Sequence, residues 1–399
     1  MTNAELIPIF LKIYGGTAQG IRMFEAPGRI NLIGEHIDYN GGHVFPAALE
    51  LRNIIAARPN GTRTITMAVT SLPNRVTSVS LNSLADYKDL AWGNYQCGVA
   101  YILLQAGYPL VGCDLLYHAN LPYGAGLSSS AAIEVSTAIC LAKMGGTEQL
   151  VMEDIALLCQ KAENQYVGVM CGIMDQFISA VGRKDHALFL NCDTLDYQYV
   201  PLELGEYTIV ITNTNTPHKH TESKYQQRRG ECLEALAVIN QNGGSFNNLC
   251  EMTLPELERF RGFFCNEKLY RRARHCVTEE QRTLQSLDAL KAGDLMAFGA
   301  LLKEANSSIR DDYEATGREL DCVFDVAASI DGVIGSRMTG GGFGGCNISI
   351  VRKDRVDHFR GIVNKAYTQQ IGYEPSFYES KAGQGALEVT PSGCRYIDV

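Results

Sequence analysis

The apolar residues of this 399-residue chain fall into short runs and helical spacings, with no long continuous stretch. Apolar runs at residues 54–57 and 64–69, divided by a turn that contains proline and glycine, predict two neighbouring strands. A run at residues 114–118 predicts a further strand. From Ser129 the apolar positions recur at spacings of three and four, which predicts a helix that ends at Gly145-Gly146.

The remainder of the chain keeps mixing the two patterns, so we expect an α+β protein. Helices are predicted over residues 153–166 and 225–239, from about Ile173, and up to about Leu302. Strands are predicted at residues 187–190, 208–212 and 347–351, and a loop at 243–253. At roughly 150 residues per domain, the length favours two domains. We divide them near residues 185–205.

Composition and charge narrow the class of protein. With 46% hydrophobic and 20% charged residues, the chain can bury a large core. The 35 basic and 44 acidic residues give a net charge of −9, so nothing indicates a protein that binds nucleic acid or an anionic membrane. Small anionic ligands stay possible, because backbone amides and a few local cations can bind them.

Cysteine usage and the length of the apolar runs bear on the compartment. The 13 cysteines are scattered and form no C-x-x-C pair, which is typical of free thiols in a reducing compartment. No run of 18 apolar residues predicts a transmembrane helix, and residues 1–10 do not resemble a secretory signal. We therefore expect a soluble cytoplasmic protein.

The strongest local signal is the loop between the strand predicted at 114–118 and the helix that follows it. Its residues are Gly124, Ala125, Gly126, Leu127, Ser128, Ser129 and Ser130. Glycines let a backbone approach a ligand closely, and serines at a helix start present amides and hydroxyls at the positive end of the helix dipole. We predict a phosphate-binding loop, with a tight turn and a helix N-cap as the alternative. The loop matches neither Walker A nor the dinucleotide-binding GxGxxG.

A second candidate segment, residues 26–42, is polar and glycine-rich although it lies between apolar runs. Arg29, Glu35, His36 and Asp38 offer a fixed cation and several hydrogen-bond acceptors. That combination suits a ligand with many hydroxyl groups, because each hydroxyl needs a partner when it is buried. A polar surface turn with local ion pairs is the alternative.

A third segment, residues 337–348, holds five glycines around Phe343. Such a loop is typical of a backbone that packs closely against another backbone or a ligand. A flexible tether is the alternative, but the segment leads directly into the strand predicted at 347–351. We therefore expect an ordered loop.

Two acidic residues, Glu163 and Asp175, complete the candidate chemistry. Taken alone, each fits a solvated side chain or a helix cap. Phosphoryl transfer, however, needs a cation ligand near the phosphates and a carboxylate near the attacking hydroxyl. The basic pairs Arg228-Arg229 and Arg271-Arg272 are expected on solvated helix faces.

The three segments, in their order and separation, resemble the three motifs of the GHMP small-molecule kinases. Residues 28–40 are similar to the galactokinase form of the first motif rather than to its mevalonate kinase or homoserine kinase forms. Residues 171–176 and 223–232 also resemble galactokinase segments, so the similarity covers about residues 24–350.

The resemblance implies a fold and an activity. An N-terminal domain like ribosomal protein S5, residues 1–190, would carry the sugar site and the phosphate loop. A ferredoxin-like C-terminal GHMP kinase domain, residues 191–399, would complete the active site in the cleft between them. The reaction would transfer the γ-phosphoryl group of ATP to the C1 hydroxyl of α-D-galactose, the first committed step of galactose use by the Leloir pathway.

The resemblance also assigns roles to individual residues. Asp175 would take or orient the C1 hydroxyl proton, and Arg29 would stabilise charge in the transition state. The sugar ligands would be Glu35, His36, Asp38, Gly172 and Tyr225. ATP would contact residues 124–130, Ser71 and Trp92, and Mg²⁺ would bind Ser130 and Glu163. Galactose and ATP would be the partners of a monomer or weak homo-oligomer.

One position departs from the family pattern. Galactokinases usually have Thr where this chain has Ile37. If the Ile37 side chain points into the core, the effect is small, whereas a side chain facing the sugar would raise KM or shift specificity. A kinase for a related sugar such as N-acetylgalactosamine, and a non-catalytic sensor of galactose and ATP, are the alternatives. The intact Ser128–Ala132 run and the presence of Arg29 and Asp175 favour an enzyme.

Overall fold

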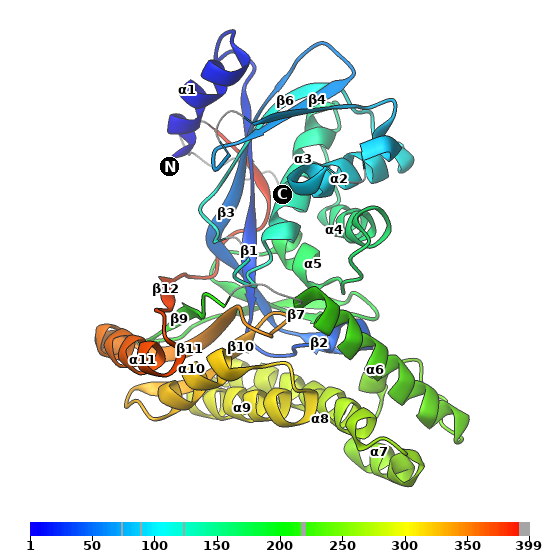
Figure 1. Cartoon of the computed structure of the whole chain (residues 1–399), viewed down its shortest axis with the longest axis vertical. Coiled ribbons are helices and arrows are strands. Elements are labelled where there is room, and N and C mark those ends of the chain that lie inside the picture. Colours follow the sequence, from blue (N-terminus) through cyan, green and yellow to red (C-terminus); the bar gives the residue numbers. More distant parts are fainter. Residues whose placement is uncertain (73–74, 88–89, 123, 217–220, 391–399) are drawn as a thin grey trace.

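The computed structural model describes residues 1–72, 75–87, 90–122, 124–216 and 221–390. The chain forms two halves, each built on a β-sheet with helices against it, as Figure 1 shows. The candidate segments lie where the two halves meet, because the strands that carry them end there.

The sheet of the first half has six strands in the order β13-β1-β3-β6-β4-β5. All pairs are antiparallel except β4 with β6. The strands are β1 (Arg22–Asn31), β3 (Pro46–Pro59), β4 (Thr64–Val69), β5 (Val76–Ser80), β6 (Cys113–Ala119) and β13 (Leu387–Val389). The strands predicted at 54–57, 64–69 and 114–118 are thus confirmed as parts of β3, β4 and β6.

Helices cover both faces of this sheet (Figure 1). One face carries α1 (Asn3–Tyr14), which packs on β3 through Leu6 and Phe10. The other face carries α2 (Asn94–Gln105), α3 (Ser129–Met144), α4 (Met152–Lys161) and α5 (Met174–Val181). The helix predicted from Ser129 is confirmed as α3, whose apolar positions, such as Val135 and Ile139, are buried in the main core.

The sheet of the second half has four antiparallel strands in the order β10-β11-β9-β12. They are β9 (Tyr207–Asn213), β10 (Val333–Thr339), β11 (Cys346–Arg352) and β12 (Ser376–Glu379). The helices of this half are α6 (Thr221–Gln241), α7 (Leu254–Phe260), α8 (Glu267–Lys291), α9 (Leu295–Ser308), α10 (Arg318–Ala328) and α11 (Val356–Ile371). No helix in the described part of the chain has the length and apolar character to cross a bilayer.

A small third sheet joins the halves. It consists of β2 (His43–Val44), β7 (His186–Asn191) and β8 (Tyr197–Pro201). Strand β7 contacts β3, and both β2 and β8 contact α8. The C-terminal strand β13 returns to pair with β1, so the first sheet includes residues from both ends of the chain. This pairing does not test the predicted domain boundary at residue 190, which stays a prediction.

Candidate active site

The first two candidate segments touch each other through their backbones. The Arg29 amide donates to the carbonyl of Leu127 (3.0 Å), and Arg29 Nη1 donates to the carbonyl of Gly126 (2.7 Å). Gly28 lets β1 approach the loop, since a Cβ there would lie 2.5 Å from the Leu127 oxygen. The predicted phosphate loop is thus held against the end of β1.

Asp175 lies at the centre of this contact. Arg29 donates two hydrogen bonds to the Asp175 carboxylate, from Nε to Oδ1 at 2.8 Å and from Nη2 to Oδ2 at 2.9 Å. Ser128, at a left-handed φ of 59°, donates its hydroxyl to Oδ2 at 2.5 Å. The Arg29 side chain is 5% exposed and that of Asp175 is 29% exposed. A buried cation therefore fixes a carboxylate that still faces outward.

Three predicted sugar ligands, Asp38, Gly172 and Tyr225, lie near Asp175 or near one another. The Asp38 carboxylate occupies the space beside Gly172, where a Cβ would lie 1.8 Å from Oδ2. Burial raises the pKa of Asp38 to about 7, and the negative charge of Asp175 adds to the effect. Burial likewise raises the pKa of Tyr225 well above its ordinary value, with Asp38 and Asp175 contributing. The structure thus brings Asp38, Gly172, Asp175 and Tyr225 together.

Glu35 and His36 connect the first segment to the third. Glu35 Oε1 accepts the Gly340 amide (2.9 Å), while Oε2 accepts Asn31 Nδ2 (2.8 Å) and pairs with Arg337. Burial raises the pKa of Glu35, against the lowering effect of Arg337. His36 Nε2 lies 3.2 Å from the Gly341 carbonyl oxygen. Both predicted ligands therefore also hold the two halves together.

The glycine-rich segment is an ordered loop, as its sequence predicts. Among its residues, Gly340 and Gly345 have φ of 86° and 79°, which side chains rarely tolerate. A Cβ on Gly345 would lie 3.3 Å from the Ala125 oxygen. The loop thus packs against the backbone of the predicted phosphate loop.

A pair of buried carboxyl groups lies behind the phosphate loop. Gln176 Nε2 donates to Glu163 (2.6 Å) and to Glu134 (3.0 Å). Burial and the charge of Asp175 raise the pKa of Glu163 to about 7. Glu134 follows Ser130 by four positions on α3, which places both side chains on one helix face. No group of three or more His, Cys, Asp or Glu side chains in the described residues could hold a metal ion.

The two remaining predicted ATP contacts, Ser71 and Trp92, lie on other segments of the first half. Ser71 is exposed in the turn after β4, and Trp92 is half-buried, with its ring and that of Tyr117 in an edge-to-face arrangement. The buried Trp92 Nε1 has no hydrogen-bond partner among the described residues.

Two expectations need revision. Arg228 and Arg272 are buried at 8% and 0% exposure, so those positions are not solvated helix faces. Sequence reasoning also missed Glu134 and Tyr313. The spacing of Glu134 from Ser130 was a usable signal, but the position of Tyr313 beside His36 depends on tertiary packing.

Comparisons with known proteins agree with this geometry. The N-terminal and C-terminal domains of the GHMP kinases match residues 94–183 and 286–369. A mevalonate kinase structure, 18% identical, aligns with a TM-score of 0.63 over 90% of this chain and 98% of its own. Fold and site thus define a GHMP kinase.

More specific matches show which family of GHMP kinases the chain belongs to. The galactokinase galactose-binding signature matches residues 9–59. The galactokinase of Clostridium tetani is 43% identical over 98% of each chain, and that of Exiguobacterium sibiricum is 44% identical over 98% of this chain and 99% of its own. The Lactococcus lactis galactokinase structure, complexed with galactose, is 39% identical with a TM-score of 0.93, covering 96% of this chain and 98% of that one. The chain belongs to the galactokinase family.

Proposed function

We propose that the protein transfers the γ-phosphoryl group of ATP to the C1 hydroxyl of α-D-galactose, giving α-D-galactose 1-phosphate and ADP. The observation that carries this proposal is that Arg29 and Ser128 both donate hydrogen bonds to Asp175. The first segment and the predicted phosphate loop thus meet at one partly exposed carboxylate. The similarity to a galactokinase complexed with galactose supports the choice of sugar.

Asp175 is the proposed catalytic carboxylate. Phosphoryl transfer depends on positioning and charge stabilisation more than on covalent chemistry. A carboxylate offers about four acceptor sites, and Arg29 and Ser128 use three of those on Asp175. The C1 hydroxyl would donate to the remaining site, so that Asp175 orients it and accepts its proton. Arg29 would stabilise the negative charge of the carboxylate and of the transferring group.

The sugar would sit against Asp38, Gly172, Tyr225 and His36. Asp38 accepts hydrogen bonds from sugar hydroxyls in this proposal, and the missing side chain of Gly172 gives it room. Glu35 would lie behind these residues, because its carboxylate already receives three groups of the protein. Buried hydrogen-bond acceptors discriminate strongly between sugars with different hydroxyl arrangements. A buried polar group that finds no partner costs binding free energy.

The nucleotide would lie with its phosphates on residues 124–130, because α3 begins at Ser129 and the free amides at a helix start suit an anion. Trp92 and Ser71 would contact the nucleoside, and the unpartnered Trp92 N–H supports this placement. Ser130 and Glu163 would hold Mg²⁺, because a hydroxyl and a carboxylate are hard oxygen ligands. When bound, the ion neutralises charge on the phosphates.

Compartment and assembly belong to the same proposal. We place the protein in the cytoplasm, as a monomer or weak homo-oligomer that acts on galactose and ATP. The twelve cysteines of the described residues are all free, which supports a reducing compartment.

The test is ADP release from ATP and Mg²⁺ with galactose, N-acetylgalactosamine, glucose, mevalonate and homoserine in parallel. We expect turnover with galactose well above the other four. Faster turnover of N-acetylgalactosamine would assign a different sugar. Galactose-dependent thermal stabilisation without any turnover would make the protein a sensor.

A further inference from the structure

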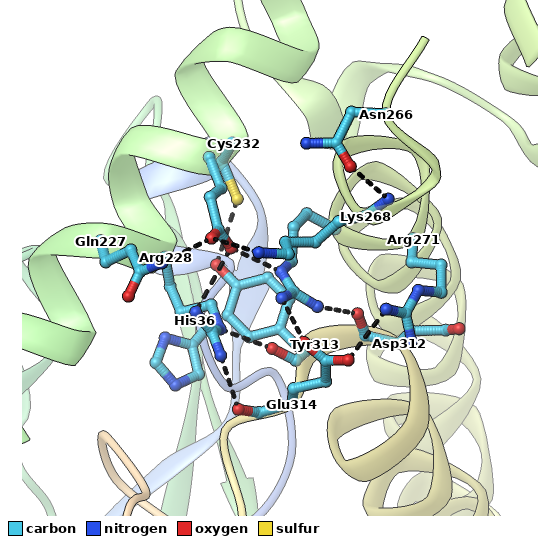
Figure 2. Close-up of polar contacts among 12 residues, drawn as sticks. His36, Gln227, Arg228, Cys232, Asn266, Lys268, Arg271, Asp312, Tyr313 and Glu314 are labelled. Atoms are coloured by element: carbon cyan, nitrogen blue, oxygen red, sulfur yellow. Dashed lines mark hydrogen bonds and ion pairs between the residues drawn. The ribbon is translucent and has the colours of Figure 1, made fainter. Parts of the chain in front are cut away.

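The turn before α10 is held by arginines from two other helices. This π-helical turn, Ile309–Tyr313, ends in Glu314 at a left-handed φ of 54°. Its last carbonyl groups have no partners within the turn, as at any helix end. Figure 2 shows guanidinium groups converging on it from α6 and α8. The pairs are Arg271 Nη1 to Asp311 O (2.9 Å), Arg272 Nη1 to Asp312 O (2.5 Å), Arg228 Nε to Tyr313 O (2.7 Å) and Arg228 Nη2 to Glu314 O (2.9 Å).

This arginine cap is itself fixed by acidic partners. Glu231 pairs with Arg272 at 2.7 Å and with Arg228 at 3.3 Å. Arg272 also pairs with Glu314 at 2.6 Å. Charge-assisted hydrogen bonds in a buried setting are stronger than neutral ones. The backbone that carries Tyr313 is therefore rigidly placed.

The Tyr313 ring lies between two imidazoles. Its centroid is 4.7 Å from that of His36 and 4.6 Å from that of His275. His275 Nε2 lies 3.2 Å from the carbonyl oxygen of Glu35, and its Nδ1 lies 2.9 Å from Ser308 Oγ. Burial lowers the pKa of His36 to about 3 and that of His275 to about 4, so both rings are neutral. Tyr313 thus packs between two rings that contact the backbone of the sugar pocket.

The hydroxyl of Tyr313 extends this contact into a chain whose direction is fixed. The Gly341 carbonyl only accepts, so His36 must carry its proton on Nε2. Nδ1 then accepts from the Tyr39 hydroxyl at 2.7 Å. Tyr39 in turn accepts from the Tyr313 hydroxyl at 2.7 Å, and Tyr313 accepts from the Cys232 thiol at 3.1 Å. Each group has one proton to give, and each gives it toward His36.

We propose that Tyr313 is a positioning residue for the sugar pocket: seated by the arginine cap, it fixes the ring plane of His36 and holds the Tyr39 hydroxyl on His36 Nδ1, which keeps His36 Nε2–H on the Gly341 carbonyl. His36 needs such support because its own backbone has a left-handed φ of 63°, which is strained for a side chain of this size. The inference rests on the proposed function, since it names what holds one of the proposed sugar ligands.

The test compares Tyr313→Phe, which keeps the ring, with Tyr313→Leu, which removes both ring and hydroxyl. The KM for galactose should rise about threefold to tenfold in Tyr313→Phe, the range expected for one lost hydrogen bond. It should rise further in Tyr313→Leu, while the KM for ATP stays within about twofold in both. Imidazole ¹⁵N spectra, with the His36 signals assigned by His36→Gln, should show the Nε2–H form in the wild type and a loss of that single form in Tyr313→Leu.

Tyr270→Phe and Tyr270→Leu are the matched controls. Tyr270 is also fully buried in this half of the molecule, and its hydroxyl donates to Glu258, but it does not contact His36. These variants should lower thermal stability without moving the galactose KM or the His36 signals. If Tyr313 variants behave like the Tyr270 variants, Tyr313 is merely structural and the inference is wrong.

The failure of this inference is distinguishable from that of the proposed function. A wild-type protein that phosphorylates no galactose overturns the function, whereas the His36 spectra still decide whether Tyr313 holds that ring. An active wild type with unchanged galactose KM in both Tyr313 variants overturns the inference and leaves the function standing.

Discussion

At the scale of single residues, position 172 requires glycine because of the neighbouring Asp38 side chain and not because of its own backbone conformation. Its φ is not left-handed, yet a Cβ would lie 1.8 Å from Asp38 Oδ2 and 2.4 Å from Asp38 Cγ. Any side chain at this position must therefore displace the Asp38 carboxylate. Burial raises the pKa of Asp38 to about 7, so a displaced carboxyl group would also lose the surroundings that set its protonation.

The substitution Gly172→Ala should raise the KM for galactose at least tenfold, because about 1.4 kcal/mol of lost sugar contact gives that factor. The KM for ATP should change little. Gly361→Ala is the control, since that helical glycine has open space around its Cβ position. Steady-state kinetics on both variants checks the prediction, and an unchanged galactose KM in Gly172→Ala would remove Asp38 from the sugar pocket.

Asp175→Asn keeps the shape of the proposed catalytic side chain but removes its charge and its ability to accept a proton. We expect kcat to fall by about 10² to 10⁴, the usual contribution of a general base. Galactose and ATP affinities, measured by calorimetry, should stay within about threefold. Substantial remaining turnover would exclude Asp175 from the mechanism.

Ile37, the departure from the family pattern, points into the core with 0% exposure. Ile37→Thr should therefore leave the galactose KM unchanged and destabilise the protein by roughly 1–3 kcal/mol, because a buried ethyl group is replaced by a hydroxyl. Urea unfolding and steady-state kinetics measure the two effects. A lower galactose KM in the variant would place this side chain at the sugar instead.

At the scale of elements, two π-helical turns carry residues that we propose for the site or its support. Ala162–Val167 presents Glu163, and Ile309–Tyr313 presents Tyr313. The helix predicted over 153–166 was therefore right in extent, but its last turn widens. Such bulges are frequent at functional sites, and their sequence carries no periodic signal that separates them from an α-helix.

Helix α8 gives the protein a pH dependence through His275. Burial lowers the pKa of His275 from its ordinary 6.5 to about 4. At this residue the unfolded chain binds a proton that the folded chain does not, so the contribution of His275 to stability falls as the pH drops from about 6.5 to about 4, by up to about 1.4 kcal/mol per pH unit. His275→Gln should show a shallower decline than the wild type in urea unfolding across this window. Parallel declines would contradict a neutral buried His275.

At the scale of the whole molecule, a buried ionic network ties the two halves together. Arg337 of β10 pairs with Glu35 of the first segment and with Glu279 of α8. All three side chains have at most 1% exposure. Burial alone would raise the pKa of Glu279, but Arg282 and Arg337 lower it to about 2. The network places the glycine-rich loop against the first segment.

Arg337→Met should destabilise the protein by roughly 3–5 kcal/mol, because it leaves the buried Glu35 carboxylate without its cation and Glu279 with Arg282 alone. Arg360→Met, which breaks a surface pair with Glu379, should leave the urea midpoint nearly unchanged. Urea unfolding of both variants tests this contrast. Equal midpoints would mean that Glu35 and Glu279 find other partners.

The sequence alone determined the local features of this protein. Period-three and period-four apolar spacing located α3, short apolar runs located β3, β4 and β6, and the three motif segments indicated a sugar kinase. These features depend on neighbours in the chain, which is why they can be read from it. The N-terminal helix α1 was missed although Thr2 and Glu5 form a capping box at its start, because Pro8 inside it interrupts the helical signal. The terminal strand β13 was missed because its pairing with β1 joins residues far apart in the sequence.

Only the tertiary structure decided how the segments combine. It set Arg29 and Ser128 on Asp175, placed Asp38 against Gly172, and buried Arg228 and Arg272, which local polarity had assigned to solvated faces. It also turned Ile37 into the core. Ion pairs and burial join residues that are distant in the sequence. A local sequence pattern therefore does not reveal which carboxylate pairs with an arginine, or whether a side chain near the end of a strand faces the core or a ligand.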